Sequence, residues 1–221
     1  MQRRTFLATS AGFVLAAPHI AAASTQRRFT IWRDGSNIGE HTLSAVQRGG
    51  NFEIAIDIKI AVKVLAITAY RYELSNREVW SGGKLQSLKS RVNDDGDKEF
   101  ANVAAAGGGL QIKGSGYSGK ASADAVTTSY FATPFLKRGP WISTQSGKPL
   151  NVRVSPVGGR EGWHQVTGEL TTRLGYNGAG EWVGCEFDAG GELATYELKG
   201  HIDHGIANFI GISNYGSQAS I

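Results

Sequence analysis

Residues 53–64 read E-I-A-I-D-I-K-I-A-V-K-V, twelve residues in which every even position is Ile or Val and every odd position is Glu, Ala, Asp or Lys. Because successive side chains of a strand point to opposite faces of a sheet, this alternation predicts a β-strand with one apolar face. At about 3.3 Å per residue the strand would be roughly 40 Å long, whereas most strands have about five or six residues. Such a face must be covered by a second sheet, by the curvature of its own sheet, or by a helix on the concave side.

The same phase continues beyond this segment. Tyr70, Tyr72 and Leu74 keep apolar residues on even positions, so a second strand begins near Ile67, or the first strand is bent there by a bulge. Further short alternating segments are separated by turns rich in Gly, Asn and Asp at 34–37, 49–51, 81–84, 93–97, 107–109, 158–159, 177–180 and 189–191. This pattern predicts an antiparallel meander.

One segment, residues 127–139, departs from the strand pattern. Thr133 is a suitable N-cap and Pro134 suits a first helical turn, so we expect one short helix with Phe131 and Phe135 on its apolar side. The predicted fold class is therefore all-β and mostly antiparallel: a strongly curved meander sheet or open barrel of about 10–12 strands with one short helix.

The N-terminal residues have the composition of an export signal. Arginines at positions 3 and 4 precede an apolar run that ends near Leu15, and Ala21-Ala22-Ala23 provides an A-x-A cleavage site. The sequence R-R-T-F-L at 3–7 resembles a twin-arginine signal, and a signal for the other export route stays open. We therefore expect a periplasmic protein that is exported by the twin-arginine machinery and cleaved near Ala23.

The chain of 221 residues then divides into three parts. Residues 1–23 are the signal peptide, 24–200 form a single antiparallel β domain, and 201–221 form a C-terminal tail in which the alternation is lost. Removal of the signal leaves 198 residues and lowers the formal net charge from +4 to +2, because two arginines are lost. No basic stripe remains, which argues against a nucleic acid partner, and no later apolar run reaches the roughly 18 residues of a membrane helix.

Catalytic and metal-binding patterns are weak. The motif H-I-D-H at 201–204 is the best metal candidate, but tetrahedral sites need three or four protein ligands, and His41 and His164 are distant in the chain. No serine elbow G-x-S-x-G occurs, so we assign no catalytic residue, no metal and no cofactor. Cys185 is the only cysteine and lies in a strand-like segment, where a small buried hydrophobe is favoured over a reactive thiol.

Large aromatic residues recur along the predicted strands, and two interpretations stay open. They fill the core, or some of them line a cavity for a hydrophobic, lipid-like ligand, since such pockets are mostly apolar with a few polar anchors. Lys59, Arg71 or Arg91 can anchor a headgroup, and the spacing does not select among them. The residues expected to line the cavity are Ile56, Ile58, Ile60, Val62, Tyr70, Tyr72, Trp80, Phe131 and Phe135.

Short segments spread over residues 27–199 carry a family resemblance. They include W-R-D-G at 32–35, I-G-E-H at 38–41, Y-R-Y at 70–72, E-V-W-S-G-G-K-L at 78–85, S-Y-F at 129–131, T-Q-S-G-K at 144–148, G-E-W-V-G at 180–184 and Y-E-L at 196–198. The set resembles a family of uncharacterised bacterial proteins with twin-arginine signals, described as a domain of unknown function. The strand order is similar to that of lipoprotein carriers, in which a curved antiparallel sheet surrounds a helix. The resemblance implies a fold and raises the expectation of an apolar ligand, but it implies no activity.

Three functions are compatible with these features. The first is a non-enzymatic periplasmic protein that binds a hydrophobic or lipid-like molecule inside the curved sheet. The second is a structural or partner-binding module of the cell envelope, whose core is filled by its own side chains. The third and least favoured is an enzyme, which would need His41 or His164 beside a carboxylate in a cleft.

Overall fold

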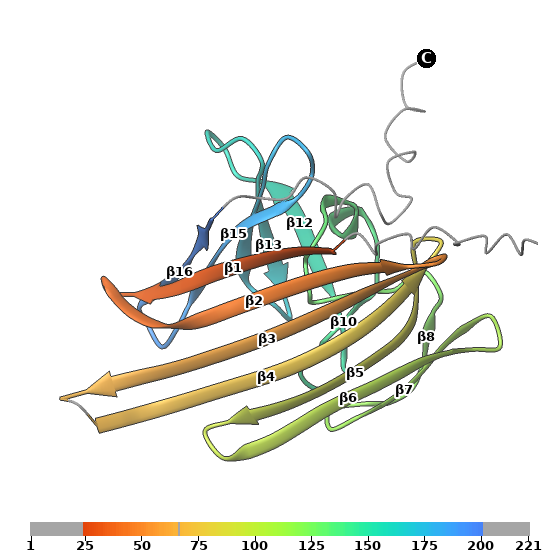
Figure 1. Cartoon of the computed structure of the whole chain (residues 1–221), viewed down its shortest axis with the longest axis horizontal. Coiled ribbons are helices and arrows are strands. Elements are labelled where there is room, and N and C mark those ends of the chain that lie inside the picture. Colours follow the sequence, from red (N-terminus) through yellow and green to blue (C-terminus); the bar gives the residue numbers. More distant parts are fainter. Residues whose placement is uncertain (1–23, 66, 201–221) are drawn as a thin grey trace, which may run out of the picture.

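The computed structural model describes residues 24–65 and 67–200, and most of these residues lie in β-strands (Figure 1). Thirteen strands form one sheet in the order β12-β13-β14-β15-β16-β1-β2-β3-β4-β5-β6-β7-β8. Their bounds are β1 (Ser24–Arg33), β2 (Ser36–Arg48), β3 (Asn51–Val64), β4 (Ile67–Ser81), β5 (Lys84–Asp94), β6 (Asp97–Ala106), β7 (Gly109–Gly114), β8 (Ser118–Ser122), β12 (Val152–Pro156), β13 (Trp163–Gly168), β14 (Thr172–Tyr176), β15 (Trp182–Asp188) and β16 (Leu193–Lys199). The sheet is strongly curved and antiparallel without closing into a barrel, which confirms the expected fold class.

The order of the strands follows the chain except at one junction. The C-terminal β16 pairs with β1, with Ile31 opposite Tyr196, so the first and last strands of the domain lie in the centre of the sheet. The predicted turns connect consecutive strands. In the β1–β2 turn, Asp34 and Gly35 have φ angles of 46° and 67°, a backbone conformation that Asp and Gly tolerate well.

The hairpin of β3 and β4 contains the long alternating segment. Both sequence-based alternatives for its end are present: β4 begins at Ile67, and the pairing register also shifts between Val62 and Lys63. The apolar face of β3 is covered unevenly. Ile54 and Ile56 are buried, whereas Ile60 is only partly buried.

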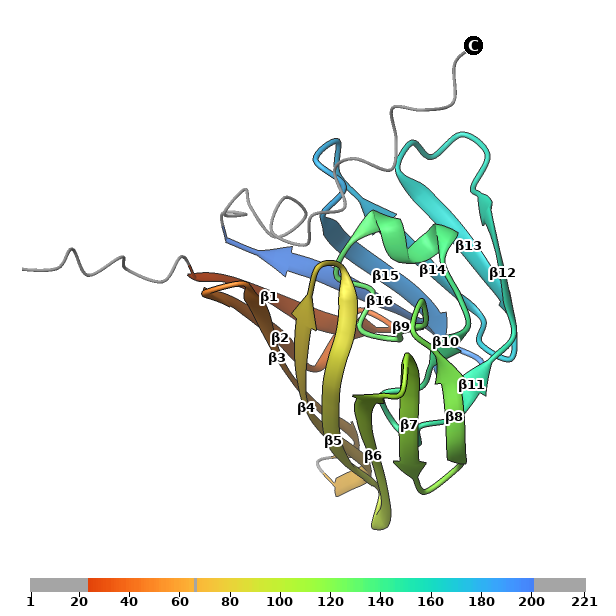
Figure 2. The same cartoon turned by 90° about the vertical axis from the view of Figure 1, so that its right-hand side faces the viewer.

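The segment between the two sheet edges, residues 123–151, lies on the concave side (Figure 2). It contains β9 (Val126–Thr127), η1 (Thr133–Lys137), β10 (Trp141–Ile142) and β11 (Pro149–Leu150). Strands β9 to β11 form a separate three-stranded sheet, in which β9 and β10 are parallel. The thirteen strands of the main sheet already exceed the expected 10–12, and these three two-residue strands, which are too short to produce a periodic sequence signal, bring the described total to 16.

The expected short helix is a single 3₁₀ turn, η1. The prediction that Thr133 caps it was wrong: the N-cap is Ala132, which makes no side-chain capping hydrogen bond. The Thr133 hydroxyl instead donates to the carbonyl of Gly180, at 2.7 Å, and so ties η1 to the β14–β15 turn. Within 24–65 and 67–200, no helix reaches the length and hydrophobicity needed to cross a membrane.

A buried carboxyl group fixes the concave segment to β4. The Glu78 side chain accepts hydrogen bonds from Asn76 Nδ2 and Trp80 Nε1 on its own strand, at 2.8 and 2.7 Å. It also accepts from the hydroxyls of Thr127 and Ser129, at 3.2 and 3.3 Å. Burial raises the pKa of Glu78, since it disfavours the charged form. The cluster places residues 127–129 against the sheet and thereby forms one wall of the interior.

Candidate functional site

A partly open cavity of about 720 Å³ lies between the concave face of β2–β4 and the strands β14–β16. One wall is formed by alternate residues of β3, namely Ile56, Ile58, Ile60 and Val62. Cavities that bind small molecules typically measure about 300–1,000 Å³ and are mostly apolar. The cavity therefore has the size and the lining of a site for an apolar molecule.

The uneven packing of β3 produces this cavity. Ile56 is 2% exposed, whereas Ile58, Ile60 and Val62 are only partly buried, so the cover over the strand becomes incomplete after Ile56. Beyond them, Leu65 at the end of the hairpin is 94% exposed. The apolar face of the strand is thus longer than the core that packs on it.

The nine residues predicted to line a cavity occupy two places. Six of them surround the cavity: Ile56, Ile58, Ile60, Val62, Tyr70 and Tyr72. Trp80, Phe131 and Phe135 pack on one another in the core, with ring centroids 4.6 to 5.8 Å apart. Trp80 lies opposite Phe52, four residues before Ile56 on β3, so this cluster packs beyond the inner end of the cavity wall.

His41 is a cavity residue that the sequence-based site prediction did not include. It lies opposite Ile58 in the β2–β3 ladder and is only 4% exposed. Its ring is surrounded by Trp182, Tyr196 and Phe29, with centroids at 5.0, 5.5 and 5.8 Å. Burial lowers the pKa of His41 to about 3, so the imidazole is neutral at physiological pH. His41 has the same strand phase as the apolar residues Leu43 and Ala45. This shared phase was the sequence signal that could have placed His41 on the inner face of the sheet.

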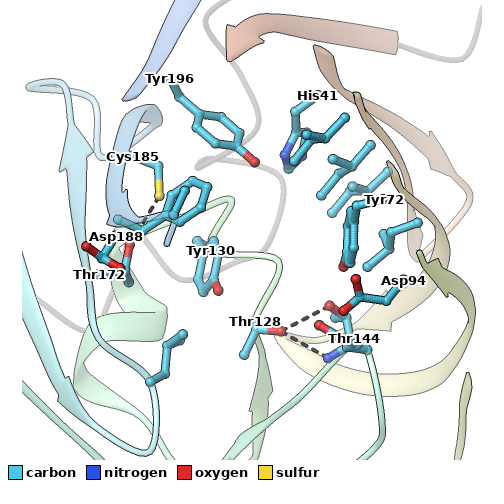
Figure 3. A pocket seen from close by; sticks show the side chains of 18 of the residues that line it. His41, Tyr72, Asp94, Thr128, Tyr130, Thr144, Thr172, Cys185, Asp188 and Tyr196 are labelled. Carbon is cyan, nitrogen blue, oxygen red and sulfur yellow. Dashed lines mark hydrogen bonds between the residues drawn. The ribbon is translucent and has the colours of Figure 1, made fainter. Parts of the chain in front are cut away.

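Tyrosine hydroxyls supply further polar groups. Tyr72, Tyr130 and Tyr196 line the cavity from three different elements, and Figure 3 shows the hydroxyl of Tyr196 pointing toward His41 across the open space. Burial raises the pKa of all three tyrosines, so their hydroxyls keep their protons. The imidazole of His41 and these three hydroxyls are therefore uncharged.

Each charged side chain in the lining, namely that of Arg33, Asp94 and Asp188, forms a hydrogen bond with a neutral group of the protein. Arg33 donates from Nε to the carbonyl of Ala189 at 2.9 Å, and Asp94 accepts from the Tyr70 hydroxyl at 2.7 Å. Asp188 lies on the opposite side of the cavity from Asp94 (Figure 3). Lys59, Arg71 and Arg91, the headgroup anchors considered from sequence, are exposed and are not lining residues of this cavity.

Cys185 and His164 are the two remaining residues that were considered for chemistry from the sequence. Burial raises the pKa of the Cys185 thiol to about 12, and its Sγ lies 3.2 Å from the Thr172 hydroxyl. His164 lies on β13 with its ring 6.1 Å from that of Tyr176, whereas the cavity histidine is His41. Within the described part of the chain, no three His, Cys, Asp or Glu side chains are placed to hold a metal ion. The H-I-D-H motif at 201–204 lies outside the described residues.

The fold and the cavity define an open, curved antiparallel β protein with an apolar interior. Residues 29–199 match the family described as Domain of unknown function (DUF6134), and the chain belongs to this family. The expected membership of an uncharacterised family is thereby confirmed.

One solved structure is similar to this protein over most of the length of both chains. It is the crystal structure of a beta-barrel-like protein of domain of unknown function DUF1849 from Brucella abortus, with a TM-score of 0.56 and 8% sequence identity. The match covers 80% of this chain and 95% of that chain. At this identity the similarity shows a shared fold alone. The comparison with curated proteins gave no match.

Proposed function

We propose that the protein is a periplasmic binding protein that holds one apolar, lipid-like molecule in the cavity without chemical conversion. The observation that carries this proposal is the continuation of the apolar face of β3 past the packed core, where Ile58, Ile60 and Val62 line a cavity of about 720 Å³. An apolar wall of this kind is costly in water, and an apolar molecule that replaces the water is favoured.

Export of the protein is part of the proposal and rests on the sequence. Residues 1–23 contain the paired arginines, the apolar run and the A-x-A site, and they lie outside the described residues. A periplasmic location would place the binding site between two membranes, where an apolar molecule needs a carrier to cross water. The proposed role is similar in kind to that of a lipoprotein carrier.

Binding of diphenylhexatriene tests the proposal directly, because this hydrocarbon fluoresces in apolar surroundings and carries no polar group. We expect the mature protein to bind it with saturable fluorescence. Ile58→Trp adds a large ring to the cavity wall and lowers the affinity at least several-fold. Lys59→Trp, the control on the same strand, places the ring on the opposite, exposed face and leaves binding unchanged.

Two outcomes would contradict the proposal. Absence of saturable binding by a folded protein would favour the alternative, an envelope module whose interior is filled by its own side chains. Equal effects of the two tryptophan substitutions would show that the hydrocarbon binds to the outer surface instead of the cavity.

A further inference from the structure

His41 and Trp182 contribute unpaired polar atoms to one part of the cavity. Both ring nitrogens of His41 and Nε1 of Trp182 are buried and have no hydrogen-bond partner among the described residues. The two ring centroids lie 5.0 Å apart, and both residues line the cavity. Buried polar groups are nearly always hydrogen-bonded, so three unpaired nitrogens at one place require an explanation.

The surrounding side chains explain why the protein does not pair these nitrogens itself. Phe29 offers no polar atom, and Tyr196 contacts the imidazole in an edge-on arrangement with centroids 5.5 Å apart. In Figure 3 the His41 ring and the Tyr196 hydroxyl are directed toward the same space. The carboxyl group of Glu78, by contrast, is fully enclosed by donors from its own fold. The unpaired nitrogens therefore belong to side chains that a molecule bound in the cavity would contact.

We propose that His41 and Trp182 form the polar anchor of the ligand, and that they bind an uncharged oxygen, a hydroxyl or a carbonyl, on an otherwise apolar molecule. This inference rests on the proposed function and adds the chemical class of the ligand to it.

The hydrogen-bonding capacity of the two side chains selects this class. A neutral imidazole has one N–H donor and one acceptor nitrogen, and the indole of Trp182 has a donor only. One hydroxyl or carbonyl oxygen can accept from both N–H groups when the facing imidazole nitrogen carries the proton, and in the other tautomer a hydroxyl can accept from the indole and donate to that nitrogen. Within the described residues, a carboxylate or phosphate would have no cation beside it at this anchor, because Arg33, the lysine or arginine in the cavity lining, lies four residues along β1 from Phe29, the residue opposite His41.

The position of His41 also sets where the apolar part of the ligand lies. His41 is opposite Ile58, and the wall continues through Ile60 to Val62, four residues further along β3. At about 3.3 Å per residue, this wall is roughly 13 Å long. The oxygen is therefore held toward the inner end, and the alkyl chain follows β3 toward the end of the hairpin.

Three ligands with the same alkyl chain test the inference: dodecanol, dodecanoate and dodecyltrimethylammonium, each measured by its displacement of diphenylhexatriene. We expect dodecanol to bind about tenfold more tightly than either ion. His41→Phe and Trp182→Phe keep an aromatic ring but remove the nitrogens. Each should reduce the preference for dodecanol over the ions several-fold. Glu40→Gln, an exposed change on β2, is the control and should preserve the preference.

The outcomes separate this inference from the proposed function. Failure of diphenylhexatriene to bind would overturn both. If the hydrocarbon binds, three results would overturn the polar anchor alone. They are equal affinity for the three ligands, tighter binding of one of the ions, and a preference for dodecanol that persists in both phenylalanine variants.

Discussion

Arg27 and Glu181 form an ion pair with a nitrogen–oxygen distance of 2.9 Å, and both side chains are buried. The pair joins β1 to the residue before β15, and Glu181 also forms an isolated β-bridge with Ala132 in the concave segment. One buried pair thus connects the central strand, the C-terminal half of the sheet and the segment that carries η1.

Removal of one member of this pair should be strongly destabilising. Arg27→Met leaves Glu181 buried without its cation, which typically costs about 3–5 kcal/mol in the free energy of unfolding. The double variant Arg27→Met/Glu181→Leu should recover most of this loss, because it removes both charges. Urea unfolding followed by tryptophan fluorescence measures both values. A loss below about 1 kcal/mol in the single variant would show that the pair is not the connection described.

Two isoleucines on one face of β3 should separate stability from binding. Ile56→Ala creates a cavity in the packed core and should cost about 2–5 kcal/mol in the free energy of unfolding. Ile60→Ala, at a partly buried position on the same face, should cost clearly less but lower diphenylhexatriene affinity several-fold. Equal losses of stability at both positions would mean that the core extends to Ile60 and fills the cavity wall.

The buried imidazole of His41 predicts a pH dependence of stability. Its pKa is about 3 in the native protein and 6.5 in the unfolded chain, so between these values the unfolded chain binds more protons. The native protein therefore loses stability as the pH falls below about 6.5, by up to about 1.4 kcal/mol per pH unit. Above that pH the group contributes no slope.

Comparison with His41→Phe isolates this contribution. Glu78, whose raised pKa acts in the opposite direction, is present in both proteins and cancels in the difference. We expect the free energies of unfolding of the two proteins to diverge in favour of the variant as the pH falls from 6.5 toward 4. Parallel curves over this range would show that His41 titrates normally and is not held neutral in the interior.

The Cys185 thiol should react slowly in the folded protein. With its pKa raised to about 12 by burial, the thiolate population at pH 8 falls by roughly a thousandfold relative to a free cysteine. Modification by a thiol-specific disulfide reagent should be at least a hundredfold slower in buffer than in denaturing urea. Rapid modification of the native protein would indicate an exposed and ionised thiol, contrary to the described packing.

The fold was largely predictable because alternation and turn chemistry are local signals. The apolar even positions of 53–64 and the turns at 34–37 and 93–97 specify strands and hairpins without reference to distant residues. The pairing of β16 with β1 was not predictable in this way, since it joins segments more than 150 residues apart. The cap of η1 was mispredicted for the same reason: the Thr133 hydroxyl binds the carbonyl of Gly180, 47 residues away.

The cavity was partly predictable. The strand phase placed Ile56 to Val62 on one wall, but it could not show that the core covers Ile56 and stops short of Ile60. The polar anchor was beyond sequence reasoning. Whether the nitrogens of His41 have partners depends on Trp182 and Tyr196, which reach it only through the β1–β16 pairing.

The most direct test of the central claim is native mass spectrometry of the protein purified from its own host, first intact and then denatured. The account predicts an additional mass that is lost on denaturation and that fragments as an uncharged, oxygen-bearing apolar molecule. A bare polypeptide mass in the native state, together with no saturable uptake of diphenylhexatriene by the same preparation, would contradict it.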